Sequence, residues 1–76
     1  MWYWVNPDNR RYYQADLVKD LLGDWTLVKA WGSLDSNRGS QRITYVASKK
    51  EGLRQIEELD TCRQNRGYLP VESLKN

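Results

Sequence analysis

The segment Trp25–Trp31, which reads WTLVKAW, decides the fold because it has the composition of a β-strand. Aromatic and β-branched residues are enriched in strands, and strand side chains alternate between two faces. One face of this segment carries Trp25, Leu27, Lys29 and Trp31, and the other carries Thr26, Val28 and Ala30. Neither face is purely polar, which predicts a central strand whose second face is partly covered or used for binding.

A further strand is predicted on each side of this segment. Residues 11–18 alternate with a period of two, so that Tyr13, Ala15 and Leu17 share one face. Residues 41–47 alternate in the same way, with Ile43 and Tyr45 on one face. The connection at 21–24 contains Gly23, which is suited to a positive φ, and the connection at 32–40 has loop composition throughout. Three successive strands with short connections predict an antiparallel meander.

The first nine residues combine an aromatic patch with a turn. Asn6–Asn9 reads NPDN, in which proline fixes φ and Asn or Asp side chains bond the local backbone. The patch Trp2–Trp4 has two alternative positions, a short edge strand or a segment folded back onto the sheet.

A helix is predicted from Ser48 to about Asn65. Ser48 and Glu51 have the spacing of a capping box, and Gly67 is a suitable stop. The apolar stripe of this helix is Leu53, Ile56, Leu59 and Cys62, and its solvated face is predicted to hold Glu57, Glu58 and Asp60. The tail 68–72 is expected to pack as a short extended piece.

These elements predict one α+β domain over residues 1–76, with its core at about residues 6–69. It would consist of a small antiparallel sheet of three to four strands, arranged as a meander, with one α-helix packed across it. A chain of 76 residues has room for a single domain.

The composition argues against catalysis and against a bound cofactor or metal. The chain has no histidine and one cysteine, Cys62, so the commonest general base and the usual zinc ligand sets are missing. Cys62 is interpreted as a small core residue. The N-terminus does not have the pattern of a signal peptide, and no apolar run is long enough to span a membrane. We therefore expect a cytoplasmic protein that is not an enzyme and has no membrane partner.

The candidate binding site lies at the end of the Trp25–Trp31 segment. A tryptophan at a strand end beside a glycine can leave its ring open to a base, and flanking cations can hold phosphates. The net charge of +2 permits such a partner. The alternative is a tryptophan that caps the core in front of a glycine turn. The predicted nucleic-acid-binding residues are Trp31, Gly32, Lys29, Arg38, Arg42 and Lys49.

The same region resembles a known family. The segments Arg10–Tyr13 (RRYY), Asp20–Gly32 (DLLGDWTLVKAWG) and Gly39–Gln41 (GSQ), with the ending Arg63–Tyr68 (RQNRGY), are similar to a WGR domain of the short free-standing bacterial type. The similarity covers about residues 6–69.

WGR domains occur in poly(ADP-ribose) polymerases, where they contact broken DNA and neighbouring domains and are not the catalytic part. The resemblance therefore implies a DNA-binding module in which the Trp31 ring stacks near the end of a DNA strand. The position of the motif arginine is Ser33 in this chain, and Arg38 and Arg42 are the candidates to replace its charge.

Two functions follow from these patterns. The first is a nucleic-acid-binding module, with DNA as the partner, that uses Trp31 and the cations near it. The second is a protein-interaction module that docks another protein, or a second copy of the chain, through Trp2–Trp4 or the outer face of the sheet. The sequence does not determine the oligomeric state.

Overall fold

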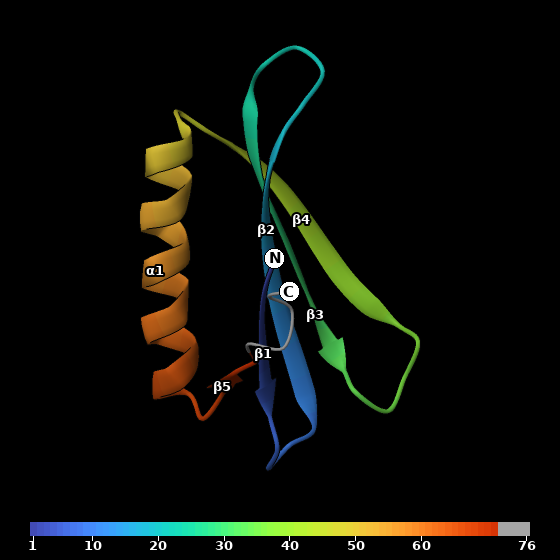
Figure 1. Cartoon of the computed structure of the whole chain (residues 1–76). Helices are drawn as coiled ribbons and strands as arrows, with labels where there is room; N and C mark the ends of the chain where they lie inside the picture. The colour runs from blue at the N-terminus through green and yellow to red at the C-terminus, as the bar shows by residue number, and fades with distance from the viewer. Residues whose placement is uncertain (72–76) are drawn as a thin grey trace.

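The computed structural model describes residues 1–71, which form one five-stranded antiparallel sheet and one helix (Figure 1). The α+β class agrees with the sequence prediction. In chain order the elements are β1 (Trp2–Asn6), β2 (Arg11–Lys19), β3 (Trp25–Ser33), β4 (Gly39–Val46), α1 (Lys49–Asn65) and β5 (Leu69–Pro70). The strand order across the sheet is β4-β3-β2-β1-β5.

The sheet has more strands than the three to four predicted, because both chain ends contribute one. β1 lies between β2 and β5, so Trp2–Asn6 is not an edge strand. β5 pairs with Trp4 and Val5, and the Val71 N–H donates to the Tyr3 carbonyl at 2.8 Å. The predicted extended tail is therefore present up to Val71, and Glu72 lies outside the described residues. The two-residue β5 was missed because it is too short to show an alternation.

The helix has the ends that the sequence predicts. The Glu51 N–H donates to Ser48 Oγ at 3.1 Å, which satisfies one free donor of the first turn. At the other end Gly67 has φ +91°, and the Tyr68 and Gly67 N–H groups donate to the carbonyls of Arg63 and Gln64. This is the Schellman arrangement of a helix C-terminus.

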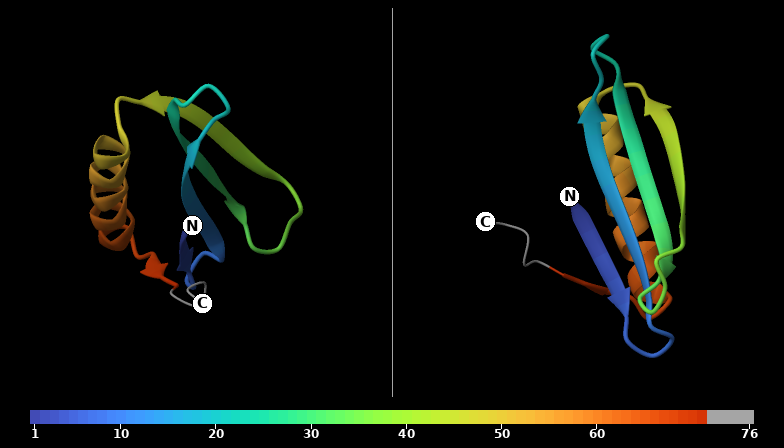
Figure 2. Two further views of the ribbon diagram at one scale, coloured as in Figure 1. Left: turned by 45° about the horizontal axis from the view of Figure 1, so that its top comes forward. Right: turned by 90° about the vertical axis from the view of Figure 1, so that its right-hand side faces the viewer.

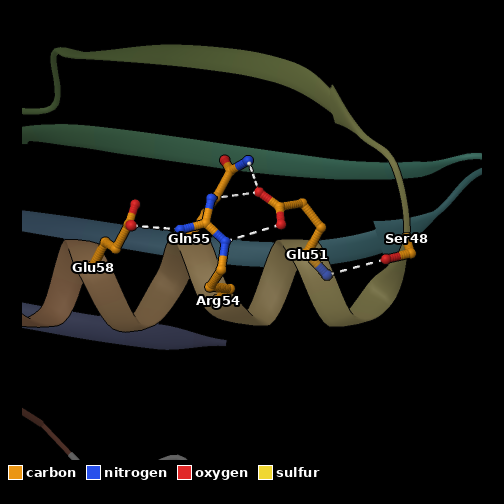
Figure 3. Close-up of polar contacts among 5 residues, drawn as sticks. All are labelled: Ser48, Glu51, Arg54, Gln55 and Glu58. Atoms are coloured by element: carbon orange, nitrogen blue, oxygen red, sulfur yellow. Dashed lines mark hydrogen bonds and ion pairs between the residues drawn. The ribbon is translucent and has the colours of Figure 1, made fainter.

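The reciprocal half of the predicted capping box does not form. The Glu51 carboxylate turns away from the Ser48 backbone and accepts from Arg54 and Gln55 (Figure 3). Arg54 also donates to Glu58, one turn further on. The guanidinium thus links two carboxylates along the helix surface.

The core lies between α1 and the β1–β3 part of the sheet. Its buried apolar residues are Trp4, Ala15, Leu27, Ile56 and Tyr68. Gly52 lets the helix approach Leu17, because a Cβ at Gly52 would lie 2.4 Å from Leu17 Cδ1. The Trp4 indole N–H donates to Asp60 Oδ1 at 2.8 Å, so the prediction that Asp60 belongs to the solvated helix face is wrong.

The helix covers only part of its face of the sheet. The right panel of Figure 2 shows α1 behind β2 and β3, whereas in Figure 1 the start of β4 slants away from the helix. Side chains of β3 and β4 on the helix side are therefore left partly uncovered. Within residues 1–71, no helix is long and apolar enough to cross a membrane.

Candidate functional site

The strand pairing sorts the charged side chains of the sheet onto one face. Residues that face each other across an antiparallel pair lie on the same side of the sheet, and Leu27, which packs against the helix, identifies the helix side. The five strands contain four cationic residues, and the register places all of them on that side: Arg11, Lys19, Lys29 and Arg42. Asp16 is the one acidic residue of the strands, and it lies on the outer side.

Two of these cations are direct neighbours. Lys29 of β3 pairs with Arg42 of β4, and like charges in directly opposed positions destabilise a sheet. None of the ion pairs in residues 1–71 involves Arg11, Lys19, Lys29 or Arg42. The carboxylates on the nearby helix have other partners, since Glu51 and Glu58 bind Arg54. The helix side of β3 and β4 is therefore a cationic surface that an anion would stabilise.

Trp31 stands at one end of this surface within an aromatic group. Its ring stacks on Tyr13 with centroids 5.8 Å apart and planes 12° apart. The Arg63 guanidinium lies 4.5 Å from the centroid of Tyr13 and 5.2 Å from that of Tyr68. Trp31 is thus partly buried, with one ring face against Tyr13, and it is not enclosed beneath the helix.

An open cleft of about 300 Å³ lies beside this group. Its lining consists of three aromatic residues and two arginines: Tyr13, Trp31, Tyr68, Arg11 and Arg63. Arg11 pairs across the sheet with Ser33. We call this cleft and its five lining residues the Trp31 cleft.

The Trp31 cleft combines uncharged aromatic rings with the positive charges of two arginines. Burial raises the pKa of the Tyr13 phenol above its ordinary value, and the nearby Arg63 opposes that rise. Tyr13 is therefore neutral at physiological pH. Within residues 1–71 the Arg63 Nε–H is buried without an acceptor, although buried donors in proteins are normally bonded.

A second aromatic group lies at the other end of β3. The ammonium groups of Lys19 and Lys49 each lie 5.9 Å from the centre of the Trp25 ring. This distance is near the outer limit of a cation–π contact, so neither lysine is tightly seated on the ring. Trp25 is partly buried and shares the helix side with Trp31.

The predicted site residues are only partly brought together. Lys29, Trp31 and Arg42 share one face, as the alternation of the strands implies. Lys49 lies beside Trp25 rather than Trp31, and six residues of β-strand separate these two rings by ~20 Å. Lys49 therefore lies at the other end of β3 from Trp31, and its part in nucleic-acid binding stays a prediction.

Gly32 and Arg38 belong to the hairpin that follows Trp31. Gly32 pairs with Tyr12 and Gly39 on the outer face, away from the Trp31 ring. A Cβ there would lie 2.9 Å from the Arg38 carbonyl oxygen and 3.1 Å from Tyr12 Cε1, so the glycine serves close packing. Arg38 is exposed in the loop, where its N–H donates to Ser36 Oγ.

Arg10, in the turn between β1 and β2, has a structural role. Arg10 has φ +57° and binds Asp35 through two nitrogens, at 2.8 to 3.0 Å. Its carbonyl also accepts from the Leu34 N–H at 2.8 Å. This clamp joins the β1–β2 turn to the β3–β4 loop and leaves Arg11, the next residue, for the Trp31 cleft.

Sequence reasoning missed Arg11, Tyr13, Arg63 and Tyr68 as parts of the site. Tyr13 and Trp31 lie in two predicted strands and face each other across them. A prediction of the register between these strands was the signal that could have found Tyr13. The positions of Arg63 and Tyr68 depend on how the helix packs against the sheet. The sequence predicts where the helix ends but carries no local signal for that packing. Cys62 is half-buried beside Arg63, and the Arg63 guanidinium, 3.6 Å from Sγ, lowers the pKa of the thiol.

Comparisons with known proteins give one distant relative. No family model matches the chain, and no solved structure matches it. The chain is similar to the uncharacterized protein y4dW of Sinorhizobium fredii (strain NBRC 101917 / NGR234), with 28% identity over 64 residues. The aligned part is 84% of this chain and 31% of the relative, so the chain spans about a third of that protein's length.

Proposed function

We propose that this chain is a non-catalytic, cytoplasmic module that binds nucleic acid through the helix side of β3 and β4. The observation that carries the proposal is the sorting of charge: every cation of the strands lies on one sheet face, together with Trp25 and Trp31, and no carboxylate of the strands shares it. The resemblance to WGR domains supports the same partner. The consecutive strand order and the helix against one face support a meander architecture of that kind.

The chemistry of binding follows from these side chains. Lysine and arginine neutralise phosphates and release condensed counterions, which makes affinity fall with added salt. Aromatic rings supply stacking to bases without sequence preference. The surface therefore suits recognition of the phosphate backbone and of base faces, with little readout of base identity.

Anisotropy titrations of labelled DNA at several salt concentrations test this proposal. Lys29→Gln and Arg42→Gln should each weaken binding and reduce the salt slope by about one. Lys50→Gln is the matched control, because Lys50 is exposed at the start of α1 and not on the sheet. No binding at low salt, or an equal effect of Lys50→Gln, would contradict the proposal.

A second candidate, docking of another protein, is favoured by the opposite face of the sheet. Ile43 and Tyr45 are 59% and 73% exposed on the outer side of β4, and Val18 is 42% exposed on the outer side of β2. Within the Trp2–Trp4 surface of that hypothesis, Trp4 is buried at 1% exposure, whereas Trp2 is 38% exposed. Tyr45→Ser should weaken a protein complex while leaving DNA affinity unchanged, and the reverse result would exclude this face.

A further inference from the structure

The two partly buried tryptophans of β3 lie on one face of the sheet, along the same strand. Trp25 and Trp31 are six residues apart in the same strand, which places them on the same side and ~20 Å apart. Each ring is accompanied by cations from other elements. Lys19 and Lys49 accompany Trp25, and Arg63 accompanies the Tyr13–Trp31 stack.

Two unpaired cations of the sheet lie between the rings. They are Lys29 and Arg42, which form no ion pair within residues 1–71. A cleft of about 420 Å³ lies along this part of β3, and Lys29 and Arg54 line it together with one carboxylate, Glu58, which is bound to Arg54. The Trp31 cleft, about 300 Å³, follows at the end near the helix C-terminus.

These residue types favour an unpaired strand over a duplex. In a duplex the bases are stacked on one another and present only their edges in the grooves. Trp31 lines the Trp31 cleft, and a ring in such a position stacks on a base that is unpaired, as in proteins that bind single strands.

We propose that a single-stranded nucleic acid lies along the helix side of β3, with one base against Trp31 and another against Trp25. Lys29 and Arg42 contact the phosphates between the two bases. This inference rests on the proposed function and names its ligand class. A span of ~20 Å corresponds to about six nucleotides at the 3.4 Å rise of a stacked strand, and to fewer when the strand is stretched.

The test compares oligothymidylates of two lengths, a trimer and a decamer, with a blunt duplex of ten base pairs. The decamer spans both rings and the trimer does not. Trp25→Leu and Trp31→Leu should each reduce decamer affinity by about 5- to 150-fold, the usual effect of one lost base–aromatic stack. Either variant should also lose most of the advantage of the decamer over the trimer. Trp2→Leu is the matched control, because Trp2 is 38% exposed on the helix side of β1, away from β3.

Lys19→Gln and Lys49→Gln provide a second test that does not depend on a tryptophan. Both lysines are exposed, so the fold should tolerate these changes, and circular dichroism checks each variant. Each variant should lower decamer affinity and leave trimer affinity at the Trp31 cleft nearly unchanged. Unchanged decamer binding by Trp25→Leu and by both lysine variants would overturn the inference while leaving the proposed function intact.

The remaining outcomes separate the two proposals further. If the wild-type chain binds the duplex more tightly than the decamer, the single-strand inference is wrong and nucleic-acid binding stands. If it binds none of the three probes at low salt, the proposed function itself fails.

Discussion

Trp4 joins the sheet to the helix by a polar contact as well as by packing. Its ring is buried, and its indole N–H donates to Asp60, which also accepts from Gln64. Trp4→Phe should lower the free energy of unfolding by ~1–3 kcal/mol, because it removes volume from the core and leaves Asp60 without one donor. Urea denaturation measures the loss. Trp2→Phe, at an exposed position, should change stability by much less, and equal losses would argue against this role of the Trp4 side chain.

Gly32 is required by the close approach of backbone in the hairpin after Trp31. A methyl group there would meet the Arg38 carbonyl oxygen, which the backbone cannot easily move. Gly32→Ala should therefore cost ~1–3 kcal/mol of stability through overpacking. Gly23→Ala is the comparison, because nothing lies within 4 Å of a Cβ there and only its φ of +90° is strained. A Gly32→Ala protein as stable as wild type in a denaturant titration would show that the hairpin adapts freely.

At the scale of elements, the sequence predicts what depends on local chemistry. Ser48 and Gly67 mark the helix because capping needs a side-chain oxygen at one end and a left-handed residue at the other. The three middle strands follow from their alternation. The fifth strand, the Trp4–Asp60 bond and the meeting of Tyr13 with Arg63 depend on contacts between distant segments, which alternation and capping do not encode. The sequence therefore predicts the candidate residues on β3 itself. It does not predict the residues that β2, the helix and the segment after it bring beside Trp31.

Glu51 on the helix surface should make the stability of the fold depend on pH in the acid range. Donors from Arg54, and then Gln55, hold the pKa of Glu51 at about 2, below its ordinary value of 4.5. A carboxylate with a depressed folded-state pKa contributes stability above its unfolded pKa, and that contribution is lost as the pH falls through the folded value. Stability should therefore decrease between pH 4.5 and about 2. The pair is exposed, so the decrease is small and best resolved at low salt.

Arg54→Gln should weaken the decrease of stability at acid pH, because it removes the donor that lowers the pKa of Glu51 most and leaves only Gln55. The urea midpoint measured as a function of pH reports the change. Arg66→Gln removes an exposed cation beyond the end of α1 that has no bond to Glu51, and it should leave that decrease in place. If the urea midpoint of the Arg54 variant fell with pH as steeply as that of the wild type, the Arg54 guanidinium would not be what lowers the pKa of Glu51.

Across the whole molecule, the two faces of the sheet have different chemistry. The helix side combines a packed core at β1–β3 with cationic and partly buried aromatic residues of β3 and β4, whereas the outer side of the strands carries exposed apolar residues and one carboxylate. The division exists because the helix covers only part of its face (Figure 2). Cations that an acidic neighbour could have neutralised are left facing each other, which lowers stability and raises affinity for anions.

Lys29 should therefore reveal a conflict between stability and binding. Lys29→Met keeps most of the side-chain stem and removes the charge opposite Arg42, so it should raise the free energy of unfolding by ~0.2–1 kcal/mol at low salt. The gain should shrink at high salt, because screening already weakens the repulsion. The same variant should bind DNA more weakly. Urea unfolding at two salt concentrations, beside an anisotropy titration, measures both effects, with Lys50→Met as the control. A Lys29→Met protein that is destabilised at low salt would mean that the Lys29–Arg42 repulsion is already relieved within the protein, and the strongest reason for an anionic partner on this face would be lost.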